Sequence, residues 1–201
     1  MKRRRALTVA TLGSTTMLVL ACAGTGTGTS SGGSNSSSSS STSSSSSSSS
    51  GEPADPKLNG MLAAHNKVRA SATPAPNPAL TPYVWSEEDA KAAQDWANGC
   101  VYNHNPSNGG RGENIFASAG TSTAEMVVKA WADEAPQYNY ETNKCSGVCG
   151  HYTQIVWAST TSVGCGMKAC STGSPFKGFT DWELWVCNYS PPGNYVGKKP
   201  Y

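Results

Sequence analysis

The sequence has no cluster of basic residues beyond its first five positions, which limits the partners that its charge can select. Four of the fifteen Lys and Arg residues are Lys2, Arg3, Arg4 and Arg5; without them, eleven basic residues face thirteen acidic ones, a net charge near −2. Domains that bind nucleic acids instead gather Lys and Arg on one surface. The composition therefore argues against a nucleic-acid partner.

Apolar residues are lacking over a long serine-rich segment near the N-terminus. Residues 30–50 are almost entirely serine and contain nothing that could be buried in a core. This segment is therefore predicted to stay a solvated, flexible coil. The foldable part is expected over residues 53–201, which is long enough for one domain with a proper core.

The first 22 residues have the pattern of an export signal. The basic start is followed by residues 6–21, which are apolar but diluted by Thr and Ser, and short for a membrane span. Their end, Val19-Leu20-Ala21-Cys22, resembles the lipobox of bacterial lipoproteins, in which the cysteine is acylated. We therefore predict a signal peptide over residues 1–22, a lipid at Cys22 and a tether over residues 23–52 that holds the domain at a membrane of the bacterial cell envelope. Secretion after cleavage nearby, without a lipid, is the alternative.

The cysteine count agrees with a lipid at Cys22. The sequence has seven cysteines, and an odd number leaves one without a disulfide partner in an exported protein. If Cys22 carries the lipid, the other six all follow residue 99 and suit three disulfides in an oxidising compartment. The count alone leaves fifteen pairings open.

Helical and extended patterns alternate along the foldable part, which predicts an α+β fold. Three helices are predicted: over residues 56–70 with Asp55 as a cap, from a cap at Ser86 to Gly99, and after a cap at Ser122 or Thr123. Strands are predicted over residues 80–85, 113–117, 163–169 and 182–189. Most of the sheet is thus expected from the second half of the chain.

The same patterns predict which side chains are buried. The third helix is expected to face the core with Met126, Val127, Ala130 and Trp131. His65 is expected to pack the first helix rather than to bind a ligand. The tryptophans are assigned to the core, although Trp182 could be exposed.

The segment Gly150-His151-Tyr152-Thr153-Gln154-Ile155-Val156-Trp157 is interpreted as an extended strand. Alternate residues of a strand point to opposite faces, so His151 would share its face with Thr153, Ile155 and Trp157. One face would then fill the core while the other borders a cleft.

Several blocks occur in the order that one family shows. The segment from Gly150 to Trp157 is one signature, and Trp185-Val186-Cys187-Asn188-Tyr189-Ser190-Pro191-Pro192-Gly193-Asn194-Tyr195 is a second. The other blocks are His65-Asn66 with Arg69, Gly112-Glu113-Asn114-Ile115, and Trp131 with Glu134. Together they resemble the cysteine-rich secretory, antigen 5 and pathogenesis-related 1 (CAP) superfamily. The likeness covers residues 56–201 and is closest to the pathogenesis-related 1 branch.

The resemblance implies a three-layer α-β-α sandwich with a mostly antiparallel central sheet and a cleft that holds two histidines and two glutamates. The matching positions are His104, Glu113, Glu134 and His151. It also implies three disulfides, which join Cys100 to Cys170, Cys145 to Cys149, and Cys165 to Cys187.

Two imidazoles suit a borderline divalent ion such as Zn²⁺, with water completing the coordination shell. Glu113 and Glu134 would orient the imidazoles or act as general base on a bound water, and they are the candidate catalytic residues. Each residue also has a plain alternative: structural hydrogen bonds for both histidines, backbone hydrogen bonds in a turn for Glu113, and solvation for Glu134. Since catalytic zinc usually has three protein ligands, a metal held by two histidines is expected to bind weakly.

Three functions fit these residues. The first is a non-catalytic binding module for a lipid, sterol, peptide or glycan, which is favoured because no arrangement of a nucleophile with a base is recognisable. The second is a metal-dependent hydrolase, such as a peptidase, in which Zn²⁺ activates water. The third is a disulfide-stabilised surface protein in which the two histidines and two glutamates no longer act. The sequence sets no expectation for the oligomeric state.

Overall fold

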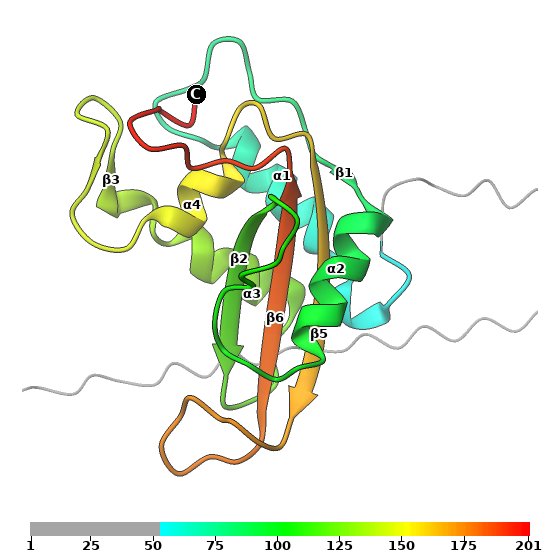
Figure 1. Cartoon of the computed structure of the whole chain (residues 1–201). Helices are drawn as coiled ribbons and strands as arrows, with labels where there is room; N and C mark the ends of the chain where they lie inside the picture. Colours follow the sequence, from blue (N-terminus) through cyan, green and yellow to red (C-terminus); the bar gives the residue numbers. More distant parts are fainter. Residues whose placement is uncertain (1–52) are drawn as a thin grey trace, which may run out of the picture. The chain divides into compact units, whose positions relative to one another are not determined.

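The computed structural model describes residues 53–201, so the predicted signal peptide, the lipid at Cys22 and the tether lie outside the described part. Its main sheet has four strands in the order β1-β5-β6-β2 (Figure 1). β1 runs parallel to β5, whereas β5 and β2 both pair with β6 in antiparallel fashion. The predicted mostly antiparallel sheet is thus confirmed. The strand bounds are Val84–Trp85 for β1, Gly112–Ser118 for β2, Ser162–Cys170 for β5 and Trp182–Ser190 for β6.

Helices cover both faces of this sheet and complete the predicted three layers. One face carries α2 (Glu87–Ala97); the other carries α1 (Met61–Ala70), α3 (Ala124–Ala132) and α4 (Gly150–Ile155) (Figure 1). None of the helices within residues 53–201 is long and apolar enough to cross a membrane. The small elements are two 3-10 helices, η1 (Pro56–Leu58) and η2 (Ala135–Gln137), and a two-stranded sheet of β3 (Tyr138–Asn139) and β4 (Lys144–Cys145).

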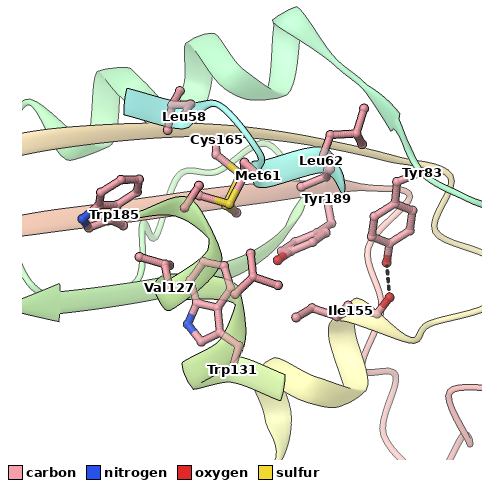
Figure 2. Close-up of a cluster of buried hydrophobic side chains, with 14 residues drawn as sticks. Leu58, Met61, Leu62, Tyr83, Val127, Trp131, Ile155, Cys165, Trp185 and Tyr189 are labelled. Carbon is pink, nitrogen blue, oxygen red and sulfur yellow. Dashed lines mark hydrogen bonds between the residues drawn. A yellow bond between two sulfur atoms is a disulfide. The ribbon is translucent and has the colours of Figure 1, made fainter. Parts of the chain in front are cut away.

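Strand β6 is buried on both faces and separates two hydrophobic cores. Leu184 and Val186 point toward Ala93 and Ala97 of α2. The residues between and after them point the other way, as the period of a strand requires. They pack against α1, α3 and α4 in the cluster that Figure 2 shows, which includes Met61, Val127, Trp131, Ile155, Trp185 and Tyr189.

Two glycines let α2 lie directly on β5. A Cβ added at Gly164 would stand 2.2 Å from the backbone nitrogen of Ala90, and one at Gly166 would stand 2.4 Å from the Cα of Gln94. The Gln94 side chain also holds the strand, since it donates to the carbonyl of Met167 (2.9 Å) and accepts from its N–H (3.1 Å). Any larger residue at either glycine would push the helix away from the sheet.

The predicted helix caps are found where the sequence places them. Ser86 Oγ accepts the N–H of Asp89 (3.1 Å), and Thr123, rather than Ser122, accepts the N–H of Met126 (3.3 Å). Asp55 also acts as a cap, but for a shorter helix than predicted. The predicted helix over residues 56–70 is interrupted between η1 and α1, because Gly60 adopts a left-handed conformation with φ of 84°.

Two burial predictions for α3, those of Met126 and Ala130, are wrong. On α3 the buried positions are Ala124, Val127, Val128 and Trp131, which recur at i, i+3, i+4 and i+7 and form one face of the helix. Met126 lies off that face and is 54% exposed, and Ala130 is exposed as well. Trp182 is only 3% exposed, in agreement with its assignment to the core; it packs in the cluster beside α2, and its indole N–H donates to the carbonyl of Thr172 (2.8 Å) in the loop that joins β5 to β6.

The segment from Gly150 to Trp157 is not a strand. Residues Gly150–Ile155 form α4, in which the N–H of Thr153 bonds the carbonyl of Cys149 (3.0 Å) and the N–H of Val156 bonds that of Tyr152 (3.1 Å). Four consecutive residues, Tyr152 to Ile155, are buried. A short helix that is enclosed on all sides shows no helical periodicity, and its alternating apolar residues then imitate a strand.

Three disulfides join Cys100 to Cys170, Cys145 to Cys149, and Cys165 to Cys187, which is the pairing that the family resemblance implies. The first ties the segment after α2 to the end of β5. The third links directly opposite residues of β5 and β6, with Cα atoms 4.1 Å apart. Three disulfides in one domain indicate folding in an oxidising, extracytoplasmic compartment.

Candidate functional site

His104 and Glu113 form the first of two histidine–glutamate pairs. His104 lies in the segment between α2 and β2, and its Nδ1 is 2.7 Å from Oε1 of Glu113 on edge strand β2. The same carboxylate oxygen accepts the N–H of Asn105 (2.9 Å). The Glu113 side chain is 3% exposed and that of His104 is 61% exposed. The Glu113 carboxylate is therefore the buried member of the pair, and the His104 imidazole that it binds is exposed to solvent.

His151 and Glu134 form the second pair, at the start of α4. His151 Nδ1 is 2.5 Å from Glu134 Oε1, while Glu134 Oε2 accepts the N–H groups of His151 (2.9 Å) and Tyr152 (3.2 Å). These N–H groups belong to the first turn of the helix, where they have no intrahelical partner. The ring of Trp131 stacks against the imidazole, with centroids 6.0 Å apart. Glu134, predicted from family position alone, thus binds both the side chain and the backbone of His151.

Both histidines present the same nitrogen for binding. An ionised carboxylate can only accept hydrogen bonds, so Nδ1 of each neutral imidazole carries the hydrogen. This leaves Nε2 of His104 and of His151 with its lone pair directed away from the glutamate. A carboxylate behind the imidazole is the arrangement that fixes the tautomer and orientation of a metal-binding histidine.

The two pairs lie at the same edge of the sheet. Asn114, next to Glu113 on β2, donates from its side-chain amide to the carbonyl of His151 (3.1 Å) and to the hydroxyl of Tyr189 (3.0 Å). Neighbouring side chains of a strand point to opposite faces, so the two pairs flank edge strand β2. Among residues 53–201, no three or more His, Cys, Asp or Glu side chains are grouped so that they could hold a metal ion.

Asn114 and Tyr189 are site residues that the sequence reasoning did not single out, although both lie inside the quoted family blocks. They connect the site to His65, which is fully buried as expected of a structural residue. His65 Nδ1 donates to the carbonyl of Met61 (2.8 Å), so its Nε2 accepts from the Tyr189 hydroxyl (2.9 Å). Burial lowers the pKa of His65 to about 4 and raises that of Tyr189 well above its usual value.

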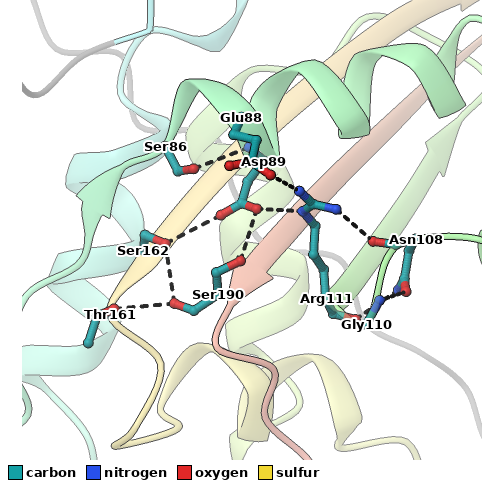
Figure 3. A network of polar contacts seen from close by, with 9 residues as sticks. All are labelled: Ser86, Glu88, Asp89, Asn108, Gly110, Arg111, Thr161, Ser162 and Ser190. Carbon is teal, nitrogen blue, oxygen red and sulfur yellow. Dashed lines mark hydrogen bonds and ion pairs between the residues drawn. The ribbon is translucent and has the colours of Figure 1, made fainter.

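A second polar cluster holds the loop that leads to Glu113 (Figure 3). Asp89 of α2 is 2% exposed and accepts from Arg111 Nε (2.7 Å), Ser190 Oγ (2.9 Å) and Ser162 Oγ (3.3 Å). Arg111 also donates to the carbonyl of Asn108 (3.0 Å) and to Glu88 (2.6 Å). The cluster ties α2, β5 and β6 to the turn that precedes β2.

Comparisons with known proteins agree with this architecture. GLIPR1-like protein 1 of Mus musculus is 38% identical over 158 residues, which are 73% of this chain and 65% of the relative. Pathogenesis-related leaf protein 4 of Solanum lycopersicum is 39% identical over 142 residues, which are 70% of this chain and 80% of that protein. The chain therefore spans slightly less than two thirds of the first relative and most of the second.

A solved structure gives the same fold. The crystal structure of NaASP2 with Zn²⁺ matches with a TM-score of 0.57 and 29% identity, over 75% of this chain and 90% of the other. Residues 62–189 match the CAP family, described as the cysteine-rich secretory protein family. This match includes the two histidine–glutamate pairs and all six disulfide-bonded cysteines. The chain belongs to the CAP, or cysteine-rich secretory protein, family.

Proposed function

We propose that this CAP-domain protein is a non-catalytic binding module that takes an apolar chain in a groove between α1 and α3. The groove has a volume of about 510 Å³, within the usual range of small-molecule sites. Its walls include the small or apolar residues Ala64, Val68, Val128 and Ala132. This groove is the observation that carries the proposal.

The rim of the groove favours a ligand with an anionic head group. Lys67 of α1 and Lys129 of α3 both line it, while the acidic Glu125 lies at its end beside Gly60. Lys129 is held by Asp133 one helical turn away (2.6 Å), so the exposed Lys67 is the cation that would meet the head group. An acyl chain ending in a carboxylate satisfies both the apolar walls and this charge, so a fatty acid is the expected ligand class.

The test is titration of the full-length chain with a fluorescent fatty acid, cis-parinaric acid. Ala132→Phe puts an aromatic ring in the groove and should weaken binding at least tenfold. Ala130→Phe is the matched control, since Ala130 is exposed on the same helix and does not line the groove. Binding that is absent from the parent chain, or equal in both variants, would overturn the proposal.

The two histidines would hold a divalent ion in the same domain. Nε2 of His104 and of His151 are the donors, Glu113 and Glu134 fix the two rings, and a borderline ion such as Zn²⁺ suits this set. The zinc named for the NaASP2 structure supports this assignment. When bound, the ion would supply Lewis acidity and a fixed positive charge at the edge of the sheet.

Zinc titration by calorimetry tests this part of the proposal. The full-length chain should bind one Zn²⁺ weakly, and the double variant His104→Ala/His151→Ala should lose that binding while its far-ultraviolet circular dichroism is unchanged. Equal titration curves for both proteins would leave the two pairs with a structural role. A hydrolase is not proposed, since catalytic zinc usually has three protein ligands and residues 53–201 offer no such group.

We also propose that the domain is anchored to a membrane through acylated Cys22. The support is the match of Val19 to Cys22 with a lipobox and the even number of cysteines left for disulfides. In a bacterial expression host, the parent chain should partition into the detergent phase of Triton X-114, and Cys22→Ser should move it to the aqueous phase. Equal partitioning of the parent chain and the variant would contradict a lipid at Cys22.

A further inference from the structure

A row of buried and partly buried polar groups lies on the sheet face beneath α2. Ser162 and Ser190, which bind Asp89, stand at one end, and Glu113 stands at the other. Asn188 lies between them. It comes two residues before Ser190 on β6, so both side chains share one face, and it pairs directly with Glu113 across β6 and β2.

Asn188 is the member of this row whose hydrogen-bonding groups are unmatched by protein. Its side chain is fully buried, yet neither Nδ2 nor Oδ1 has a hydrogen-bond partner among residues 53–201. Oε2 of Glu113 is buried and unmatched in the same way, although Oε1 receives two hydrogen bonds. Buried polar groups nearly always have a partner, from protein or from ordered water, because leaving them unpaired costs the free energy of desolvation.

The unmatched groups are complementary and close. Directly opposite residues of an antiparallel pair have Cβ atoms about 4.5–5.5 Å apart, so the Asn188 amide and the Glu113 carboxylate are neighbours. The Asn188 amide offers a hydrogen-bond donor and Oε2 of Glu113 lacks one, but the two side chains do not bond directly. Strand β5 lies on the other side of Asn188 and leaves no room there for a large ligand. Its Gly164 pairs with Asn188 and lies against the backbone of α2. A water molecule fits such a polar, narrow site.

We propose that Asn188 binds one or two internal water molecules that bridge its amide to Oε2 of Glu113, and that Asn188 thereby positions the His104–Glu113 pair. The first water accepts from Asn188 Nδ2 and donates to Glu113 Oε2. A second water donates to Asn188 Oδ1. With hydrogen bonds on both oxygens, the carboxylate cannot rotate, and the imidazole that it binds keeps Nε2 turned outward.

A crystal structure of the full-length chain at better than 1.5 Å tests the water site directly. We expect an ordered density peak within hydrogen-bond distance of both Asn188 Nδ2 and Glu113 Oε2. Either of two results overturns the site: no peak between the two side chains, or a direct hydrogen bond between them. This measurement does not depend on whether the protein binds a metal.

The positioning role rests on the proposed metal binding by His104, and zinc titration tests it separately. Asn188→Leu keeps the volume and removes the amide, so zinc affinity should fall by about 10–100-fold, as when an outer partner of a metal-binding histidine is lost. The matched control is Val186→Ala, on the same face of β6 and equally buried, which should lower stability but leave zinc affinity unchanged.

Each outcome of the titration has one meaning. Equal zinc affinity in the parent chain and Asn188→Leu overturns the positioning role. A parent chain that binds no zinc overturns the proposed metal site, and the electron density alone then decides the water site. Should Asn188→Leu fail to fold, Asn188→Val repeats the titration.

Discussion

The two histidine–glutamate pairs have the same contact between Nδ1 and Oε1, but a different member of each pair is held by the fold. In the His104–Glu113 pair the glutamate is rigid, since it is 3% exposed on a strand while the histidine stands 61% exposed on a loop. In the His151–Glu134 pair the histidine begins a helix, stacks on Trp131 and is 25% exposed. The same histidine–glutamate pair can thus be held in place through its glutamate, as at Glu113, or through its histidine, as at His151. The His151 imidazole is therefore held by the surrounding fold, whereas the exposed His104 imidazole is held through its contact with Glu113.

The largest effect is expected when the support of His151 is removed. Trp131 is 2% exposed and its indole N–H donates to the carbonyl of Ile115 (3.2 Å). Trp131→Ala should lower the free energy of unfolding by about 3–5 kcal/mol, as large aromatic truncations in a core do. Urea unfolding of the full-length chain, followed by circular dichroism, measures this. Trp96→Ala, at a partly exposed tryptophan near the His104 side, is the control and should cost less; equal losses would contradict the comparison.

A smaller effect should follow from acid on the side of His151. The His65 pKa of about 4 lies below the 6.5 of the unfolded chain, so the unfolded state binds more protons between these values. The contribution of His65 to stability is therefore complete above pH 6.5 and is lost as the pH falls to 4, by about 3 kcal/mol at 1.4 kcal/mol per pH unit.

Urea unfolding at pH 7 and pH 4.5 measures that loss, and His65→Gln supplies the comparison. The variant cannot take up the proton, so its stability should depend less on pH than that of the parent chain over this window. An identical pH dependence in both proteins would show that carboxylates elsewhere account for the whole effect. Because hydrogen bonds connect His65 to His151 through Tyr189 and Asn114, this measurement concerns the His151 side of the comparison.

The smallest effect is expected at an exposed contact on the side of His104. Glu88 and Asp89 both bind the Arg111 guanidinium, but their side chains are 85% and 3% exposed. Glu88→Ala should change the free energy of unfolding by less than about 1 kcal/mol, since exposed ion pairs contribute little. Asp89→Ala, which leaves a partly buried arginine without its main partner, should cost several times more, about 3 kcal/mol. Thermal denaturation of both variants would decide, and equal shifts would contradict the role of burial.

The sequence was most informative where local chemistry and structure coincide. Ser86 before three acidic residues predicts the start of α2 because the cap bonds are made within one turn. The apolar runs of β5 and β6 likewise predict strands, since both faces of these strands are covered. The set of four site residues came from the family resemblance, because side chains separated by 9, 21 and 17 positions carry no local signal.

The sequence failed where burial is decided by distant segments. Tyr152 to Ile155 alternate like a strand, yet they lie in helix α4; because all four are buried against distant segments, no polar face marks the helical period. Met126 is apolar but exposed, since the face of α3 that meets the sheet is defined by Val127, Val128 and Trp131. The partners of Asn114 lie 37 and 75 residues away, so its link between β2 and His151 has no sequence pattern.

The contact of α2 with Gly164 and Gly166 has a mechanical consequence. At these two glycines the helix and the strand meet backbone to backbone, so no side chain lies between them that could change rotamer to allow movement. If α2 slid or rolled on β5, main-chain atoms of the two would clash. We therefore expect α2 and the sheet to move as one rigid unit. Any movement that admits a ligand must come from the opposite layer, where α1 and α3 meet through side chains.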